Sequence, residues 1–384
     1  MKASRLSSFG LRAAALVLAA LPSIAEFRAA SVKVDITPDK PQWLLGYAAR
    51  QSTGIHDRIH HRIVAMDDGE KQFFLVSSEI CLVSPAEYDR VAAELEKKTG
   101  IQPAQFWWTV THTHSAPEVG PPGLAAAFLG ERYTHAVDPA YTEMAERSLI
   151  EGIVEARGRL APARLGFGWG YSMANINRRA RDVEGETYLG LNPDGPADRR
   201  IGLLRLDRQD GKPLALIANY AMHGTVLGQQ NTLISGDAQG IVAEYVEQKT
   251  GAPMLYINGA AGNLAPVYTV QPDPRSGRLR QFRALLGERI LEASRAVMST
   301  SAEVKLTTGA ITVETPMKKG LIPPAELKQY FPAASGGPGI VRLPVRFLRI
   351  NNDIAIWAAP LELFCEIAMA VRERSPFPHT LYFG

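Results

Sequence analysis

Histidines follow two apolar runs of this sequence, at positions where they could carry out metal or acid–base chemistry. His112 and His114 lie two residues apart after the apolar run 106–110. We therefore expect their side chains to project to one face and to converge on one ion or one substrate. His223 follows a second apolar run and precedes Gly224. The His-x-His pair alone leaves open a metal site or a hydrogen-bonded surface pair, and His223 alone favours a structural role.

Ser235 is a second candidate, because it lies just before a predicted helix in the segment 233–237, which reads Leu-Ile-Ser-Gly-Asp. A hydroxyl and free backbone N–H groups at such a place can face a reacting carbonyl. The alternative is a capping loop in which Ser235 or Asp237 satisfies backbone donors. The sequence lacks a Gly-x-Ser-x-Gly elbow, a Walker loop and a His-Glu-x-x-His helix, so it gives little support to a Ser-His-Asp mechanism or to nucleotide chemistry.

The remaining histidines point less clearly to chemistry. His56, His60 and His61 form a short cluster that could bind metal, but a strand with charged residues on its solvent face explains most of it. His135 and His379 have no obvious partner in the sequence. We expect both to be structural.

Apolar runs and helix-capping signals alternate along the chain and set the expected elements. We expect strands at residues 75–80, 106–110, 203–206, 214–222 and 254–257. Helices are predicted at 85–98, where Ser84 caps and Gly100 ends the helix, at 141–156, at 241–249 and, as the longest, at 279–297. The Pro- and Gly-rich stretch 316–344 indicates a long surface loop or lid. This order predicts an α/β fold of mixed β-sheets flanked by helices in a single large catalytic domain.

The first 25 residues have the features of a secretory signal peptide. A basic start precedes the apolar stretch 13–21 and the small-x-small site Ser23-Ile24-Ala25. The apolar stretch is shorter than the roughly 20 residues that a spanning helix needs. We therefore expect residues 1–25 to be removed, the mature chain to start near Glu26, and the protein to be secreted or periplasmic.

Composition limits the classes of partner and of stabilisation. The chain has a formal charge of +3, and residues 1–25 carry three positive and no negative charges, so the expected mature chain is neutral. Nucleic acid is then an unexpected partner, because phosphate binding needs a basic surface. Cys81 and Cys365 are the two cysteines among 384 residues; they could form one disulfide or remain two separate buried thiols.

Several short motifs, in their order along the chain, resemble those of the neutral ceramidase family. The Thr-His-Thr-His-Ser and Ile-Ser-Gly-Asp segments are the most specific of them, and the series covers nearly the whole expected mature chain. The matching segments are residues 34–38, 45–48, 54–56, 111–117, 175–178, 223–225, 234–237, 360–362 and 374–380.

The resemblance implies a zinc enzyme that hydrolyses the N-acyl bond of ceramide to a fatty acid and a sphingoid base. It places the metal ligands on His112, His223 and Glu362, and two histidines, a glutamate and an open water position are a known hydrolytic zinc site. His114 and Arg178 would line the site and stabilise the oxyanion or pass a proton to the leaving amine. Ser235 would act as nucleophile or as substrate hydrogen-bonder, and we favour the second. A lipid amide substrate also suggests peripheral contact with a membrane surface.

Three departures from the family motifs leave the acyl and headgroup specificity open. The Pro-Gly-Glu motif reads Pro-Leu-Glu at 360–362, Asn263 stands where many relatives carry Asp, and Ala-Gln at 238–239 replaces Asn-Lys. The chain also stops at Gly384, before the family segment that supplies a further Tyr ligand and an immunoglobulin-like domain. We therefore expect residues 26–384 to be the catalytic domain, truncated at its C-terminal end.

Two other functions remain open at this point. One is a metal-dependent esterase or phosphoesterase in which Asp237, Asn263 and the histidines form a two-metal site. The other is a non-catalytic lipid- or glycan-binding relic that keeps the fold. Metal content and turnover would distinguish the three.

Overall fold

The computed structural model describes most of the chain in detail. The described residues are 26–120, 130–133, 135, 138–267, 279–319, 322–323, 325–332 and 339–384. The expected signal peptide, residues 1–25, lies outside the described residues.

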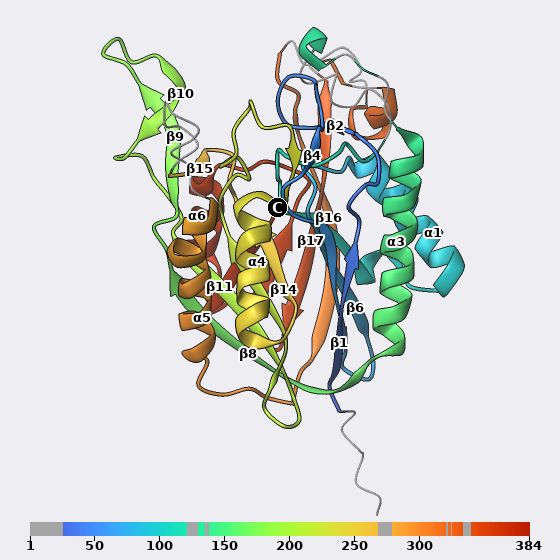
Figure 1. The fold of residues 1–384 in the computed structure, drawn as a ribbon. Coiled ribbons are helices and arrows are strands. Elements are labelled where there is room, and N and C mark those ends of the chain that lie inside the picture. Colours follow the sequence, from blue (N-terminus) through green and yellow to red (C-terminus); the bar gives the residue numbers. More distant parts are fainter. Residues whose placement is uncertain are drawn as a thin grey trace, which may run out of the picture.

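The largest sheet has eight strands in the order β14-β12-β11-β8-β1-β5-β6-β7 (Figure 1). Its outermost pairs, β14 with β12 and β7 with β6, are parallel, and the other neighbours are antiparallel. The prediction of a mixed sheet is therefore confirmed. The strands are β1 Arg28–Asp35, β5 His60–Asp67, β6 Gln72–Ser78, β7 Phe106–Val110, β8 Ala161–Tyr171, β11 Arg200–Arg208, β12 Pro213–Tyr220 and β14 Met254–Asn258.

Helices cover one face of this sheet, because alternate strand residues are apolar on that side. Ile63 on β5 packs among residues of α1 (Pro85–Thr99) and α3 (Pro139–Gly158), at the right of Figure 1. Leu216 on β12 packs among residues of α4 (Asp237–Thr250) and α5 (Glu288–Arg295). The pair α1 and α3 and the pair α4 and α5 thus lie on the same sheet face.

A four-stranded sheet covers the opposite face. Its order is β16-β17-β18-β19, and the last two strands are parallel. The alternate residues of β5, such as Val64, pack there against Leu348 and Phe383 of this second sheet. The strands are β16 Leu306–Pro316, β17 Ile340–Ile350, β18 Ile354–Ala358 and β19 His379–Phe383, and α6 (Cys365–Arg374) joins the last two. The chain is thus one domain of mixed sheets and helices, as predicted.

The eight-stranded sheet curves until its two edges come together. β14 contacts both β6 and β7, although they lie at opposite ends of the strand order. Ser77 Oγ on β6 donates a hydrogen bond to Tyr256 O on β14. Because of this curvature, the loops that follow β7 and β12 emerge close to each other.

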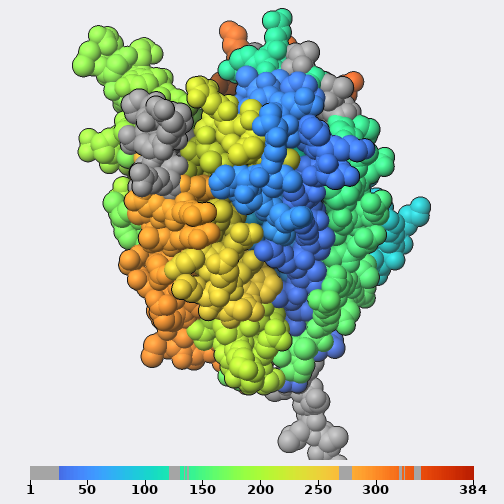
Figure 2. Space-filling model, in the orientation of Figure 1, coloured from blue at the N-terminus to red at the C-terminus, as the bar shows by residue number. Residues whose placement is uncertain are grey.

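Small sheets hold the loops at this end of the molecule. β9 (Asn175–Arg181) pairs with β10 (Thr187–Asn192) and with β15 (Leu264–Pro266). The β9–β10 hairpin projects from the body of the protein (Figures 1 and 2). A parallel pair joins β4 (Gly54–Ile55) to β13 (Leu233–Ile234), and β2 (Trp43–Leu44) pairs with β3 (Arg50–Gln51).

Capping signals located α1 correctly. Ser84 Oγ accepts a hydrogen bond of 3.1 Å from Glu87 N, and Gly100 ends the helix in the left-handed region with φ +75°. The strands expected at 75–80, 106–110, 203–206, 214–222 and 254–257 and the helices at 141–156 and 241–249 are also present, with ends shifted by a few residues.

Two predictions about the second half of the chain were wrong in part. Residues 279–295 are helical, as expected, but a 3₁₀ turn (η4, Leu279–Gln281) and a π segment (η5, Arg283–Gly287) precede the short α5, and α3 is the longest helix of the described residues. The loop expected at 316–344 is shorter, because β16 extends to Pro316 and β17 begins at Ile340, with a short η6 (Ala325–Tyr330) between them. Pro344 fits within β17 because β18 pairs with β17 only from Arg346 onward.

Among the helices of the described part of the chain, none has the length and apolar composition to cross a membrane. Cys81 and Cys365 are both free and buried, so the two-thiol alternative is the correct one.

A buried ionic network ties α4 to the sheet. Arg62 on β5 and Glu79 after β6 are both almost fully buried and pair at 2.6 Å. The Arg62 Nε atom also donates to Glu247 on α4 at 2.6 Å, and Glu247 accepts from Lys33 of β1 at 2.8 Å. Burial opposes ionisation of Glu79, but Arg62 and His60 outweigh it and lower its pKa to about 2.

We predict that Glu79→Gln lowers the free energy of unfolding at neutral pH by about 3 kcal/mol, because Arg62 loses a buried partner. The native pKa of Glu79 is depressed, so its stabilisation is present above the ordinary value of 4.5 and is lost as the pH falls toward about 2. Between about pH 7 and pH 3, the free energy of unfolding measured in urea should therefore fall less in Glu79→Gln than in the wild type.

The matched control is Glu314→Gln, which removes an exposed ion pair with Arg342 and should cost under about 1 kcal/mol. An equal loss of unfolding free energy in Glu79→Gln and Glu314→Gln would contradict a special contribution of Glu79 to stability.

Candidate functional site

The loops after β7, β12 and β18 bring three predicted site residues together. His112 follows β7, His223 follows β12 and Glu362 follows β18. One imidazole nitrogen of each histidine and a carboxylate oxygen of Glu362 all lie within 4.8 Å of one another. His114 and Arg178 border the same group.

His112 reaches this group through a left-handed turn and not by strand alternation. Its φ is +64°, a conformation that non-glycine residues rarely adopt. The turn is held by backbone hydrogen bonds: His112 N donates to Ile80 O, Gly224 N to His112 O and His114 N to Gly224 O, at 3.1, 3.2 and 2.8 Å. His112 and His114 therefore do converge, as expected, but β7 ends at Val110 and the turn alone aims them.

Both principal histidines present an unprotonated Nε2 atom to the same point. The Nδ1–H group of His112 donates to Cys81 O, and that of His223 donates to Ala261 O, both at 2.7 Å. A carbonyl can only accept, so each neutral ring carries its proton on Nδ1. The two Nε2 atoms then face each other at 3.1 Å with two lone pairs and no proton between them, an arrangement that a cation would stabilise.

The donor spacing fits a tetrahedral zinc ion. Two ligands with Zn–N bonds of about 2.0–2.1 Å lie about 3.3 Å apart at a tetrahedral angle. Here the Nε2–Nε2 distance is 3.1 Å, and the Glu362 oxygens lie 3.4 Å from His112 Nε2 and 3.5 Å from His223 Nε2. The carbonyl partners of the Nδ1 atoms are the usual outer contacts of metal-binding histidines.

Electrostatics favour neutral imidazoles beside an ionised carboxylate. Burial, together with the neighbouring His112, lowers the pKa of His223 to about 4. Burial, together with the neighbouring His112 and His223, lowers the pKa of His114 well below its ordinary value. Partial burial opposes ionisation of Glu362, but the close contact with His223 and the neighbouring His112 and His114 outweighs it and lowers the pKa of Glu362. This is the ionisation state that metal ligation requires.

Arg178 and His114 both border this group. Arg178 Nη2 donates to His223 Nε2 at 3.0 Å and to Gly262 O at 2.9 Å. His114 Nε2 lies 3.3 Å from His112 Nε2, and its buried Nδ1 atom has no hydrogen-bond partner among the described residues. Both side chains thus end beside the convergence point of the nitrogens.

The order of these motifs and the geometry of the group agree with a sequence comparison. The family described as neutral/alkaline non-lysosomal ceramidase, N-terminal, matches residues 27–261, which is more than half of the chain. This chain belongs to the neutral/alkaline non-lysosomal ceramidase family.

Curated ceramidases and solved ceramidase structures resemble the chain over different lengths. It is 27% identical over 226 residues to the neutral ceramidase of Mycobacterium tuberculosis and 28% identical over 222 residues to neutral ceramidase B of Dictyostelium discoideum. These matches cover 54% and 55% of this chain and 33% and 30% of the relatives. The chain therefore matches about a third of their length.

The fold extends further than the sequence similarity. The neutral ceramidase of Pseudomonas aeruginosa superimposes with a TM-score of 0.72 at 20% identity, covering 94% of this chain and 67% of that one. A structure described as ceramidase complexed with C2 gives a TM-score of 0.73 at 18% identity and covers 94% and 68%. The architecture described above is thus the ceramidase fold.

Ser235 does not join the histidine group in this ceramidase-family chain. Its side chain is fully buried, and its hydroxyl donates to Asp57 Oδ1 at 2.5 Å and accepts from Asp237 N at 2.9 Å. A hydroxyl with both roles occupied and no exposure is not placed to contact substrate. The structure therefore favours the capping alternative over the expected catalytic role.

The two residues proposed for a two-metal site are also engaged elsewhere. The Asp237 carboxylate accepts from the backbone N–H groups of Val226, Leu227 and Ala238. Asn263 donates to Glu366 and accepts from Cys365 N. Asp237 thus fixes the loop that follows His223 and is not directed at the metal-binding point.

Cys81 is a neighbour of the group that sequence reasoning missed. Its Sγ lies within 4.8 Å of nitrogen atoms of His112 and His114, and its carbonyl orients His112. Its position just after a predicted strand was the available signal. Burial raises the pKa of this thiol well above its ordinary value, so it stays protonated.

The other histidines have structural partners. His61 bonds Ser78 Oγ at 2.6 Å and Ala145 O at 2.9 Å, and His60 pairs with Glu79. Because β5 is buried along its whole length, the solvent-facing strand expected here was wrong. His56 pairs with Asp57 at 2.6 Å. His135 stacks on Trp43 and His379 on Phe167, which agrees with structural roles.

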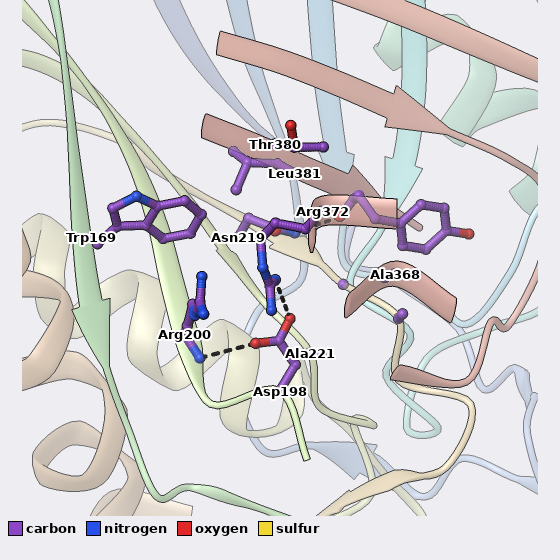
Figure 3. Close-up of a pocket in the computed structure, with 12 residues that line it drawn as sticks. Trp169, Asp198, Arg200, Asn219, Ala221, Ala368, Arg372, Thr380 and Leu381 are labelled. Atoms are coloured by element: carbon purple, nitrogen blue, oxygen red, sulfur yellow. Dashed lines mark hydrogen bonds and ion pairs between the residues drawn. The ribbon is translucent and has the colours of Figure 1, made fainter. Parts of the chain in front are cut away.

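A separate polar pocket is lined in part by Ala368 and Arg372 of α6 and by none of the site histidines (Figure 3). Asp198 accepts from Arg372 Nη1 at 2.6 Å and from the backbone N of Arg200 at 3.4 Å. The cavity of this pocket is about 20 Å³, which gives room for about one water molecule. The pocket is too small for a substrate.

We predict that Gly224→Ala disrupts the site more than it disrupts the fold. A Cβ atom at Gly224 would lie 2.6 Å from Thr113 Cα, so the loops that carry His112 and His223 must move apart. A displacement near 1 Å costs about 100-fold in rate. Metal affinity by chelator competition and amidase rate should both fall at least about 10-fold.

Gly158→Ala is the control, because nothing lies within 4 Å of a Cβ atom at this last residue of α3. It should leave both quantities unchanged. Wild-type metal affinity in Gly224→Ala would show that the backbone contact does not set the histidine geometry.

Proposed function

We propose that this chain is the catalytic part of a zinc-dependent amidase that hydrolyses the N-acyl bond of ceramide-like lipids to a fatty acid and a sphingoid base. Family membership supports the reaction class. The observation that carries the proposal is the pair of unprotonated Nε2 atoms of His112 and His223, which face each other at 3.1 Å beside the Glu362 carboxylate.

His112, His223 and Glu362 would hold the ion, and an open fourth position would face solvent. Zinc bound there would supply Lewis-acid chemistry, lowering the pKa of a water molecule and polarising an acyl carbonyl. Glu362 is the exposed member, with 55% of its side chain accessible against 8% and 2% for the two histidines. The scissile amide would therefore approach from the Glu362 side.

The side chains around the ion would stabilise charge and move protons. Arg178, fixed by two hydrogen bonds to Gly262 O, carries a permanent positive charge beside the site and would stabilise the oxyanion. His114 would hold a proton near the departing amine, because its Nε2 atom borders the same point.

The proposal also covers where the enzyme is located and whether it contacts a membrane. We infer that the enzyme is exported, because residues 1–25 have the basic and apolar pattern of a signal peptide. A lipid amide as substrate favours peripheral contact with a membrane surface, and the neutral expected mature chain gives no basis for nucleic-acid binding.

Replacing His112 or His223 by Ala should remove bound zinc and turnover together, because each loss leaves too few ligands for a catalytic site. Glu362→Gln should weaken zinc binding and abolish turnover while the melting temperature stays near that of the wild type. Zinc per chain by atomic emission spectrometry and amidase rate test this.

The matched control is His379→Ala, since His379 stacks on Phe167 outside the group. It should keep zinc. Full zinc occupancy in His112→Ala or His223→Ala would refute the ligand assignment.

The substrate class is tested on the zinc-loaded chain with a panel of N-acyl sphingosines, simple N-acyl amides, carboxyl esters and phosphoesters. We expect release of fatty acid from the sphingosine amides with about one zinc per chain. Two zinc ions per chain with ester turnover alone would favour the two-metal esterase. Binding of long-chain amides without turnover at full zinc occupancy would favour the non-catalytic relic.

A further inference from the structure

Asp57 follows β4 and lies against the residues that precede α4, outside the histidine group. Figure 2 shows the blue N-terminal segment directly beside the yellow segment that begins α4. Only 10% of the Asp57 side chain is exposed. Its carboxylate accepts from Ser235 Oγ at 2.5 Å and from Gly236 N at 2.8 Å, and it contacts His56 Nδ1 at 2.6 Å. Asp57 therefore fixes Ser235 and Gly236 relative to β4.

Ser235 in turn holds the turn that carries the histidines. Ser235 N donates to Ser115 O at 2.8 Å, and Ser235 O accepts from Thr113 Oγ1 at 2.9 Å. Thr113 is fully buried and lies between His112 and His114. Any shift of Ser235 is thus transmitted by two hydrogen bonds to the segment that aims both imidazoles.

The path of hydrogen bonds from Asp57 to the turn is continuous. The hydroxyl of Ser235 also accepts from Asp237 N, so removing its acceptor on Asp57 leaves a buried O–H group that must rotate or move. The left-handed conformation of His112 requires outside support, because L-residues rarely adopt it unaided.

We propose that Asp57 is a positioning residue of the site, which acts through Ser235 and Thr113 to hold His112 and His114 in the arrangement that binds metal. The metal readout rests on the function proposed above. Outer contacts of metal ligands change affinity by about 10- to 100-fold when removed. Asp57 does not touch substrate, and its effect passes through the backbone of the turn.

A purely structural role is the competing explanation, because Asp57 also lies at the N-terminal end of α4, where a negative charge stabilises a helix. Asp57→Ala would then lower the melting temperature without altering the site. The test therefore compares Asp57→Ala, Asp57→Asn, Thr113→Val and the Asp57→Ala/Thr113→Val double variant. The control is Asp35→Ala, which removes a carboxylate paired with the exposed Arg58.

Three quantities are measured on the whole chain: zinc affinity by chelator competition, amide hydrogen exchange of residues 111–116 without metal, and melting temperature. Asp57→Ala should weaken zinc about 10- to 100-fold and speed exchange in residues 111–116. Asp57→Asn should recover part of the affinity, because its Oδ1 atom still accepts from Ser235. The zinc affinity of the double variant should be no lower than that of the single variant with the lower affinity. The two substitutions interrupt the same path, so their effects should not add.

A lower melting temperature in Asp57→Ala with wild-type zinc affinity and wild-type exchange would overturn the proposal, as would additive losses in the double variant. If the wild type bound no zinc, the proposed function would fail, and the exchange measurement would still decide the role of Asp57. Unchanged exchange in residues 111–116 would then refute it.

Discussion

The site depends on one backbone contact, the exchange of hydrogen bonds between the His112–His114 turn and Gly224. Gly224 N donates to His112 O and Gly224 O accepts from His114 N. A side chain at position 224 has no space, because its Cβ atom would meet Thr113 Cα at 2.6 Å. This contact joins the loop after β7 to the loop after β12, strands that stand six places apart in the sheet order. It is possible only because the sheet curves until β14 meets β6 and β7.

The loop before α4 supports this contact from behind. Ser235 bonds the His112–His114 turn through its backbone, Asp237 bonds the loop after His223 through its carboxylate, and Gln239 Nε2 donates to Met222 O beside it. The buried Arg62–Glu79–Glu247 network fixes α4 itself on the sheet. Burial of charges is costly unless they are paired, so the pairing holds these three side chains, and α4 with them, in one arrangement. In this chain, the Ile-Ser-Gly-Asp segment at 234–237 thus has a geometric role.

Local signals predicted most of the fold, because capping residues and strand alternation act over a few residues. Ser84 and Gly100 located α1, and the apolar run 106–110 is β7 with the predicted bounds. The two errors arose where tertiary packing decides. Pro344 lies in a strand because its neighbour β18 pairs only from Arg346, and the π segment of residues 283–287 brings Gly287 against Tyr245 of α4. Neither contact is visible in local sequence.

The candidate site was predicted in part for a similar reason. Residue type and strand-end position singled out His112 and His223 as candidates, whereas only the family motif pointed to Glu362, and the structure brings all three together. The sequence places Ser235 near a helix start without showing which way its hydroxyl faces; here it faces Asp57 and is fully buried. Asp57 itself had no sequence signal, since an Asp beside a His in an exposed segment is common.

The distribution of exposure around the group limits how a substrate can reach it. His112, His114 and His223 are enclosed by the loops that orient them, while Glu362 and its neighbours Leu361 and Phe364 remain accessible, with 37% and 41% of the latter two exposed. Phe364 packs under Arg179 of β9, on the strand that also carries Arg178 to the site. A substrate that arrives from this side meets Leu361, Phe364 and the Glu362 carboxylate before it reaches the buried imidazoles. That sequence of surfaces suits a molecule whose polar amide is attached to hydrocarbon, because the chain can stay in contact with Leu361 and Phe364 while the amide reaches the polar group.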